Sequence, residues 1–191
     1  MKPLEEIKKE IEEELSQKRY EHSVSAMKKA IELAIKYGED EEKAAYTALI
    51  HDIAKEMTKE EYYMYAEKNN IKFDEFDKYE IVALHGKIGA DIAKKRYGFT
   101  QEMQNAICYH TTGRADMTLL DKIVYLADKT EETRDYEGVE KLRNVMKSKG
   151  LDEAILWDID NLTIPKMIKK QKMIHPDSLY ARNDIILKLK K

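Results

Sequence analysis

Apolar residues recur at three- and four-residue spacing along almost the whole chain, and this periodicity constrains the fold more than any other feature. Such spacing places side chains on one face of an α-helix, whereas a half-buried strand needs strict alternation, which we find nowhere. Glycine (7 residues) and proline (3 residues) are scarce, so few helix breakers interrupt the pattern. We therefore predict an all-α fold, with helices near residues 4–18, 21–37, 40–55, 59–69, 78–97, 101–110, 117–131, 138–148, 152–172 and 178–189.

The chain has 191 residues and no linker-like stretch rich in proline, glycine or serine, so we expect a single domain over residues 1–191. With 34 basic and 37 acidic residues, the net charge of −3 does not favour binding to nucleic acid or an anionic membrane. Cys108 is the one cysteine, which excludes an internal disulfide. The amino-terminal segment lacks the apolar core of a signal peptide, so we expect a cytoplasmic protein; a homodimer remains open.

Six ionisable residues occupy positions that the helical pattern reserves for hydrophobic side chains. His22 shares a helical face with Ala26 and Ala30, for example, and His85 follows Ile81 by four residues. Two of the six are adjacent in the segment LIHDIAK and lie about 100° apart around one helix, so both can reach the same interior point. The six are His22, His51, Asp52, His85, His110 and Asp128.

Each of these residues alone is more simply explained as a hydrogen-bonded core side chain. Together they place four imidazoles and two carboxylates in the core, with no matching set of buried lysine or arginine to neutralise them. A bound cation resolves this, and histidine with carboxylate but without cysteine suits iron, manganese or zinc. Six ligands exceed what one catalytic ion needs while keeping an open position, so we predict two ions that share a bridging carboxylate.

In sequence order, these residues form the pattern H…HD…H…H…D, which resembles the HD-domain metal-dependent phosphohydrolases. Longer segments are similar to the bacterial YqeK family, the symmetrical bis(5′-nucleosyl)-tetraphosphatases. The resemblance covers a core motif region, residues 19–143, and leaves C-terminal helices over residues 152–189 to pack on it. The segments are RYEHS, LIHDIAK, LHGKIGADIAKKRYG, AICYHTTGR and LDKIVYLADK.

The resemblance implies an HD-domain helical bundle with a di-iron centre that splits diadenosine tetraphosphate into two ADP molecules. By motif position, Asp52 bridges two ions. The first ion is then held by His22, His51, Asp52 and Asp128, and the second by Asp52, His85 and His110. The sequence departs from the family pattern at Thr133, where we expect proline before Arg134.

Two neighbouring cations can lower the pKa of a bridging water to near neutral, so hydroxide becomes available as the nucleophile. We predict Asp52 and Lys55 as catalytic residues, Lys55 because it follows His51 by one helical turn. The expected ligand is a small dinucleoside polyphosphate or nucleoside diphosphate, whose charge requires further cations and hydrogen-bond donors. Candidates for substrate binding are Arg19, Lys55, Lys87, Thr111, Thr112, Gly113, Arg114 and Arg134.

Two alternatives remain open at the level of sequence. The chain could be another HD-type nucleotide phosphohydrolase or phosphodiesterase, which substrate turnover would distinguish. It could instead be a catalytically idle nucleotide-binding HD module that keeps its metals for stability. The complete set of six ligand candidates favours an enzyme, and tight nucleotide binding without hydrolysis would favour the idle module.

Overall fold

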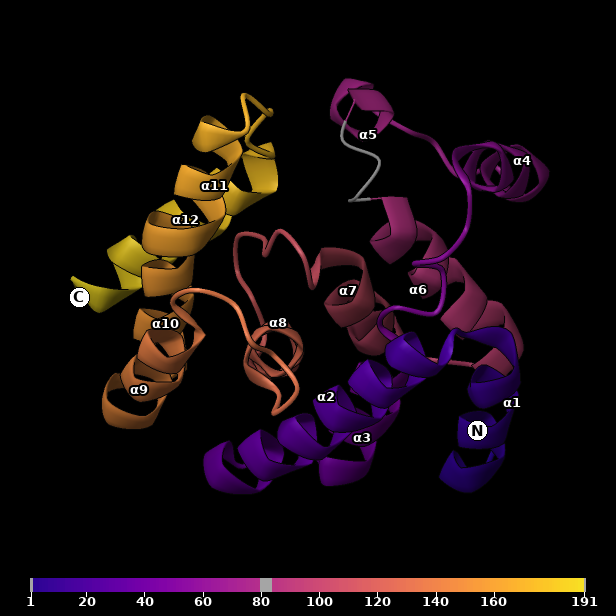
Figure 1. Cartoon of the computed structure of the whole chain (residues 1–191), viewed down its shortest axis with the longest axis horizontal. Helices are drawn as coiled ribbons and strands as arrows, with labels where there is room; N and C mark the ends of the chain where they lie inside the picture. Colours follow the sequence, from indigo (N-terminus) through magenta and orange to yellow (C-terminus); the bar gives the residue numbers. More distant parts are fainter. Residues whose placement is uncertain (1, 80–83, 191) are drawn as a thin grey trace.

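Figure 1 shows the computed structural model, an arrangement of packed helices in which the structure describes residues 2–79 and 84–190. The prediction of an all-α fold is confirmed, and these residues contain no strand. The elements are α1 (Leu4–Glu14), α2 (Gln17–Tyr37), α3 (Glu41–Ile50), α4 (Lys59–Asn69), α5 (Glu75–Tyr79), α6 (Leu84–Tyr97), α7 (Gln101–Tyr109), α8 (Leu119–Thr130), α9 (Val139–Lys149), α10 (Leu151–Asp158), the π-helical turn η2 (Ile159–Thr163), α11 (Ile164–Lys169) and α12 (Pro176–Leu189).

The boundary between the first two helices differs from the prediction of helices over 4–18 and from 21 onward. Helix α1 ends at Glu14 and α2 begins at Gln17. Ser16 causes the break, because its hydroxyl accepts a hydrogen bond from the backbone N–H of Arg19 and so caps α2. As a result Arg19 lies in the first turn of α2, one helical turn before His22.

Helix α3 ends at Ile50, whereas we predicted that it continues to residue 55. The chain continues as turns, in which the N–H of Ile53 bonds to the carbonyl of Ile50 and the N–H of Lys55 to that of Asp52. These bonds span three residues and wind the chain more tightly than an α-helix. His51 and Asp52 therefore lie at a helix end, and both side chains are buried.

Two further predicted helices correspond only in part to the described elements. The prediction over 78–97 corresponds to α6, which begins at Leu84. Residues 80–83, with Ile81 of the predicted apolar face, lie outside the described residues. We did not predict the short helix α5. The prediction over 152–172 corresponds to α10, η2 and α11. Pro165 lies in the first turn of α11, and because it has no N–H it cannot bond to a carbonyl in the preceding turn.

Helices α2 and α3 lie side by side, α8 packs against α2, and α7 lies between α6 and α8 (Figure 1). One hydrophobic cluster runs through these helices, from Ile7 in α1 to Ile185 in α12. The C-terminal helices take part in it, because α10 packs on α8 and α12 packs on α10. A continuous core of this kind is a property that a single domain must have.

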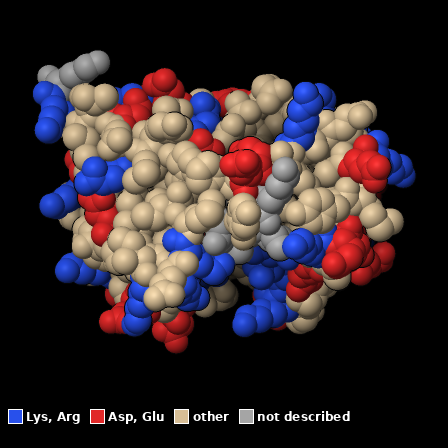
Figure 2. Space-filling model, turned by 90° about the horizontal axis from the view of Figure 1, so that it is seen from above, with Lys and Arg blue, Asp and Glu red and all other residues tan. Residues whose placement is uncertain are grey.

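Acidic and basic side chains are interspersed over the face seen in Figure 2, and neither sign dominates it. This distribution agrees with the small net charge of −3. An anionic ligand must therefore be met by a few local cations rather than by a broad basic field. Across residues 2–79 and 84–190, none of the helices combines the length and the apolar character needed to cross a membrane.

Candidate metal centre

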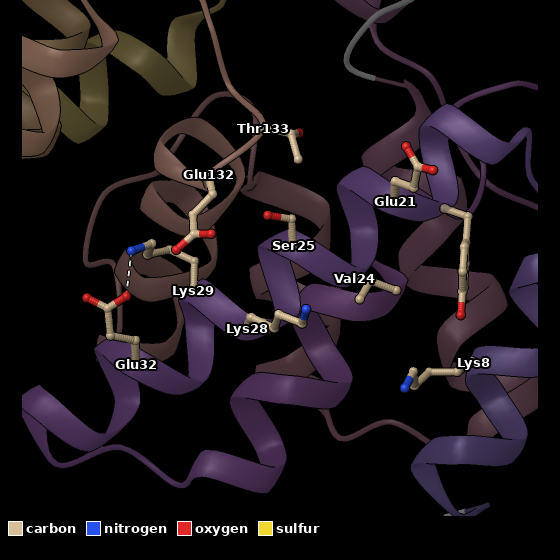
Figure 3. Close-up of a pocket in the computed structure, with 10 residues that line it drawn as sticks. Lys8, Glu21, Val24, Ser25, Lys28, Lys29, Glu32, Glu132 and Thr133 are labelled. Carbon is tan, nitrogen blue, oxygen red and sulfur yellow. Dashed lines mark hydrogen bonds and ion pairs between the residues drawn. The ribbon is translucent and has the colours of Figure 1, made fainter.

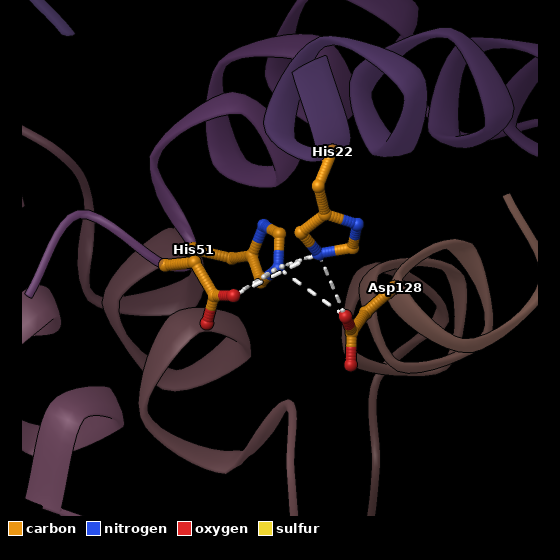
Figure 4. Close-up of side chains that lie close together, drawn as sticks. His22, His51 and Asp128 are labelled. Atoms are coloured by element: carbon orange, nitrogen blue, oxygen red, sulfur yellow. Dashed lines mark hydrogen bonds and ion pairs between the residues drawn. The ribbon is translucent and has the colours of Figure 1, made fainter. Parts of the chain in front are cut away.

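Four side chains from three parts of the chain form what we call the first ligand group: His22, His51, Asp52 and Asp128. Figure 4 shows His22, His51 and Asp128 converging from α2, the end of α3 and α8. The Nε2 atom of His22 lies 3.3 Å from Nε2 of His51 and 3.1 Å from Oδ1 of Asp128. All the potential ligand atoms of the group lie within 4.8 Å of one another, which is close enough for one cation.

The second ligand group consists of Asp52, His85 and His110. The Nε2 atoms of His85 and His110 lie 2.9 Å apart, and 3.2 and 3.4 Å from Oδ1 of Asp52. The other carboxylate oxygen, Oδ2, faces the first group, 3.7 Å from Nε2 of His22 and 3.6 Å from Nε2 of His51. Asp52 thus presents one oxygen to each group, as a carboxylate that bridges two cations would.

The imidazoles of the second group are buried in a way that keeps them neutral. Burial lowers the pKa of His85 to about 3 and also lowers the pKa of His110. In His22 burial acts in the same direction, but hydrogen bonds to Asp128 and Glu131 outweigh it and raise the pKa. Neutral imidazole is the form that binds a metal, so His85 and His110 are ready as ligands near neutral pH.

Both carboxylates remain ionised despite their surroundings. Burial would raise the pKa of Asp52, but electrostatic interaction with His51, together with His110, His85 and Lys55, holds the pKa well below the ordinary value. In Asp128 the interactions with His22, His51 and Arg134 likewise outweigh burial and hold the pKa far down. Oδ1 of Asp52 is buried and receives no hydrogen bond from any described residue. The ammonium of Lys55 lies 3.5 Å from this oxygen, and a metal cation in contact with it would stabilise the buried charge further.

Hydrogen bonds on the far side of two rings direct their ligand atoms to the centre. Nδ1 of His51 lies 2.6 Å from the carbonyl oxygen of Ala48, and Nδ1 of His110 lies 2.6 Å from that of Ile107. Because a carbonyl can only accept, each Nδ1 carries the proton and each Nε2 presents its lone pair. Neutral imidazole nitrogens with carboxylate oxygens and no thiolate suit iron, manganese or zinc. The residues therefore fit a metal centre.

Three of the predicted substrate-binding cations border this centre. Nη1 of Arg19 lies 2.6 Å from Oδ2 of Asp52, and Nζ of Lys55 lies 3.5 Å from Oδ1 of the same residue. Arg134 hydrogen-bonds Asp128 through Nη2. The side chains of Arg19, Lys55 and Arg134 are 27%, 27% and 31% exposed, so each reaches from solvent to a buried carboxylate. Burial lowers the pKa of Lys55 more than Asp52 raises it.

Comparison with known proteins places this centre in a family. The HD domain pattern matches residues 19–133, which include all six ligand candidates. The chain belongs to the HD-domain family. Proteins named symmetrical bis(5′-nucleosyl)-tetraphosphatase from Halalkalibacterium halodurans and Bacillus subtilis are 37% and 33% identical to it over 177 residues. The match covers 92% of this chain in both cases, and 93% and 94% of the relatives, so the chain is a member of that hydrolase family.

A solved structure shares the fold of this HD-domain protein. It comes from Clostridium acetobutylicum and is described as a predicted HD superfamily hydrolase involved in NAD metabolism. The two chains superpose with a TM-score of 0.93 at 36% identity, covering 98% of this chain and 99% of the other. The HD-domain helical fold expected from the sequence is thus confirmed along nearly the whole chain.

Two of the predicted substrate-binding residues have partners away from the ligand groups of this HD domain. Lys87 is bonded to the fully buried Asp77. Nη2 of Arg114 lies 2.6 Å from Oδ2 of Asp121, in the first turn of α8. The structure does not bring either cation to the centre, so their contact with substrate stays a prediction.

The segment Thr111–Thr112–Gly113 follows His110, and its residues differ in their contacts. Oγ1 of Thr111 lies 3.2 Å from Nε2 of His110, at the edge of the second ligand group. The hydroxyl of Thr112 donates to the carbonyl of Gly113. Gly113 has φ of 71°, and a Cβ there would lie 2.9 Å from the Cβ of Ala181. Glycine is therefore needed at position 113 for close packing on α12. Of the three residues of this segment, Thr111 is the one whose side chain lies beside a ligand group, where it could meet a phosphate.

We did not predict Glu131 from the sequence, although it belongs to the centre. Its side chain is fully buried, and Oε1 lies 3.0 Å from Nδ1 of His22. Its position was a usable signal, because Glu131 follows Asp128 by three residues and so continues the same helical face. An acidic residue one turn beyond a ligand is well placed to support a second ligand from behind.

A groove of about 390 Å³ lies beside α2 and is separate from the six ligand candidates (Figure 3). Its charges are mixed, and within it Lys29 is already paired with Glu32. Of the residues that line the groove, Ser25 follows His22 by three residues, and Thr133 hydrogen-bonds Glu131. None of the six ligand candidates lines the groove. The lining residues are Lys8, Tyr20, Glu21, Val24, Ser25, Lys28, Lys29, Glu32, Glu132 and Thr133.

Proposed function

We propose that this protein hydrolyses diadenosine tetraphosphate symmetrically, giving two ADP molecules. The observation that carries the proposal is the pair of ligand groups sharing Asp52, bordered by three cationic side chains. The relatives described above are named for this reaction, which supports the choice of substrate. A tetraphosphate chain is highly anionic, so a site with two cations and several basic residues suits it.

The cofactor in this proposal is a pair of divalent or trivalent cations, one in each ligand group, with iron favoured and manganese or zinc as alternatives. When bound, such a pair lowers the pKa of water toward neutral and offsets negative charge on phosphoryl oxygens. Asp52 spans both groups, while His22, His51 and Asp128 complete the first and His85 and His110 the second.

The side chains around the centre supply binding and charge. Hydrolysis adds a water oxygen to one of the two central phosphorus atoms, and the bond from that phosphorus to the bridging oxygen breaks. The bridging oxygen leaves on the second ADP, where negative charge grows in the transition state. Lys55 and Arg19 approach Asp52, and Arg134 approaches Asp128, so positive charge is available on both sides of the centre. In this proposal Lys55 stabilises the leaving phosphate and Arg19 and Arg134 bind the outer phosphates.

The decisive experiment is chromatography of the products formed from diadenosine tetraphosphate by protein loaded anaerobically with iron. ADP as the sole product is expected. ATP plus AMP would mean asymmetric cleavage and would contradict the proposal. Tight binding of the substrate with no product over hours would instead identify an idle nucleotide-binding module.

A second candidate substrate is suggested by the Clostridium acetobutylicum protein, which is described as involved in NAD metabolism. NAD is also a dinucleotide with a phosphoanhydride bridge, although its bridge carries fewer charges. Both compounds should therefore be offered to the same loaded protein at equal concentration. Faster consumption of NAD would make NAD the better candidate, and consumption of the tetraphosphate alone would exclude it.

A further inference from the structure

Three of the four histidines in the ligand groups have an Nδ1 atom hydrogen-bonded to an acceptor that orients the ring, and the acceptor of His22 differs in kind from those of His51 and His110. His51 and His110 each donate from Nδ1 to a backbone carbonyl three residues earlier in their own turn. Any residue at those earlier positions provides such a carbonyl. His22 donates instead to the carboxylate of Glu131, at 3.0 Å. The orientation of His22 therefore depends on a side chain that a substitution can remove.

Glu131 is itself held in one orientation. The backbone N–H of Thr133 lies 2.6 Å from Oε2, and the hydroxyl of Thr133 lies 2.7 Å from Oε1. Arg134 adds a longer ion pair, with Nε 3.7 Å from Oε1. The side chain of Glu131 is fully buried, whereas Thr133 is exposed. A buried carboxylate with partners on both oxygens can fix the ring to which it is bonded.

We propose that Glu131, held by Thr133, is a positioning residue for His22. It keeps the proton of His22 on Nδ1 and so directs the Nε2 lone pair into the first ligand group. The inference rests on the proposed two-cation centre and adds that the two ligand groups depend on Glu131 unequally. Among the described residues, the contacts of Glu131 include His22 but neither His85 nor His110.

The negative charge of Glu131 matters as well as its geometry. A carboxylate partner makes an imidazole a stronger electron-pair donor than a neutral amide partner does. Glu131→Gln keeps an acceptor for Nδ1 but removes the charge, whereas Glu131→Ala removes both. The affinity of the first ligand group should therefore fall in the order wild type, Glu131→Gln, Glu131→Ala.

The test is a titration of the metal-free, full-length protein with Mn²⁺, following free Mn²⁺ by electron paramagnetic resonance. The wild type is expected to bind two ions. Glu131→Ala should weaken one of the two by about 10–100-fold and leave the other unchanged. Glu132→Ala is the matched control, because Glu132 is the adjacent glutamate, is exposed, and changes the net charge equally. It should titrate as the wild type does.

A second readout does not depend on bound metal. ¹⁵N NMR of the histidine rings reports which nitrogen of His22 carries the proton. The spectra are recorded at a pH above the raised pKa of His22, where the ring is neutral. The Nδ1–H tautomer is then expected in the wild type, and a mixture of tautomers in Glu131→Ala. Thr133→Val, which keeps the shape of Thr133 but removes its hydroxyl, should give a smaller change in the same direction.

The outcomes separate this inference from the proposed function. If Glu131→Ala matches Glu132→Ala in both measurements, the positioning role is refuted while the two-cation centre stands. If the wild type takes up no Mn²⁺, the proposed centre fails, and the tautomer of His22 still tests the role of Glu131. Should Glu131→Ala not fold, Glu131→Gln is compared with Glu132→Ala in the same two measurements, and a smaller effect is expected.

Discussion

The two ligand groups share Asp52, yet different contacts hold them together. The first group joins residues of α2, the end of α3 and α8, and in it the Nδ1 atom of His22 is hydrogen-bonded to Glu131. The second lies where α6 meets α7, and there the backbones approach closely: a Cβ at Gly86 would lie 2.5 Å from the carbonyl oxygen of Cys108. The geometry of the first group thus depends on the buried side chain of Glu131. The geometry of the second depends on Gly86, which has no side chain and so lets α6 and α7 approach closely. Similar donor sets can be preorganised by either means.

The largest expected effect follows from the residue that the groups share. Asp52→Ala removes an oxygen from each group and leaves the imidazoles without their buried anion. Both cations should be lost, and turnover of diadenosine tetraphosphate should fall by about 1,000-fold or more. Elemental analysis of the purified variant and a product assay measure this. Full turnover in Asp52→Ala would exclude the proposed centre.

Gly86→Ala is expected to damage the second group alone. The new methyl group would meet backbone atoms of α7, so α6 must move away and carry His85 from His110. We expect one cation instead of two and a loss of about 1–3 kcal/mol in the free energy of unfolding.

Gly89→Ala is the control for that change, because it lies in the same helix and its Cβ would make ordinary contacts of 3.4 Å or more. Alanine also favours a helix over glycine by up to about 1 kcal/mol, so this variant should be neutral or slightly stabilised. Two cations bound to Gly86→Ala, with unfolding like that of Gly89→Ala, would show that the close approach is unimportant.

Arg114→Ala distinguishes a cation that supports the fold from those that border the centre. Arg114 neutralises Asp121, which is almost fully buried, so its loss should cost about 2 kcal/mol of unfolding free energy. KM for the tetraphosphate should change less than threefold if the role of Arg114 is structural. Urea unfolding and steady-state kinetics measure the two effects. A large rise in KM without destabilisation would restore the predicted role of Arg114 in substrate binding.

The smallest expected effect is a pH dependence of stability in the metal-free protein. Burial would raise the pKa of Glu131, but hydrogen bonds from His22 and Thr133 lower it from 4.5 to about 2. A lowered pKa in the folded state contributes stability that is complete above the unfolded value and is lost as the pH falls through the folded value. The advantage of the wild type over Glu131→Gln should therefore shrink progressively as the pH falls from about 5.5 toward about 2. A constant difference in urea midpoint over that range would contradict this assignment.

Helical periodicity predicted the fold class, which is confirmed, and selected six ligand candidates that the structure brings together in two groups. Both depend on which side chains face the core. Helix ends were less predictable. Ser16 ends the first helix inside a charged run, and Pro165 lies where a continuous helix was expected. Such interruptions depend on single hydrogen bonds that compete with the helix, and an apolar pattern does not record them.

Some residues around the ligand groups could be predicted from local spacing in the sequence, and others could not. Lys55 was predicted from its spacing to His51 and lies at the centre, whereas Arg114 was predicted from its nearness in sequence to His110 and is paired with Asp121. Glu131 was missed because its partner His22 is far away in the sequence and meets it only when α2 packs beside α8. Local spacing predicts contacts within a helix, but tertiary packing decides which long side chains reach a site.

The central claim, that two cations share Asp52, is tested most directly by anomalous X-ray diffraction from crystals of the Mn²⁺-loaded protein. We expect two anomalous peaks about 3.5–4 Å apart, one beside each carboxylate oxygen of Asp52. One peak would therefore lie among His22, His51 and Asp128, and the other beside His85 and His110. A single peak, or two peaks of which one lies away from Asp52, would contradict the account.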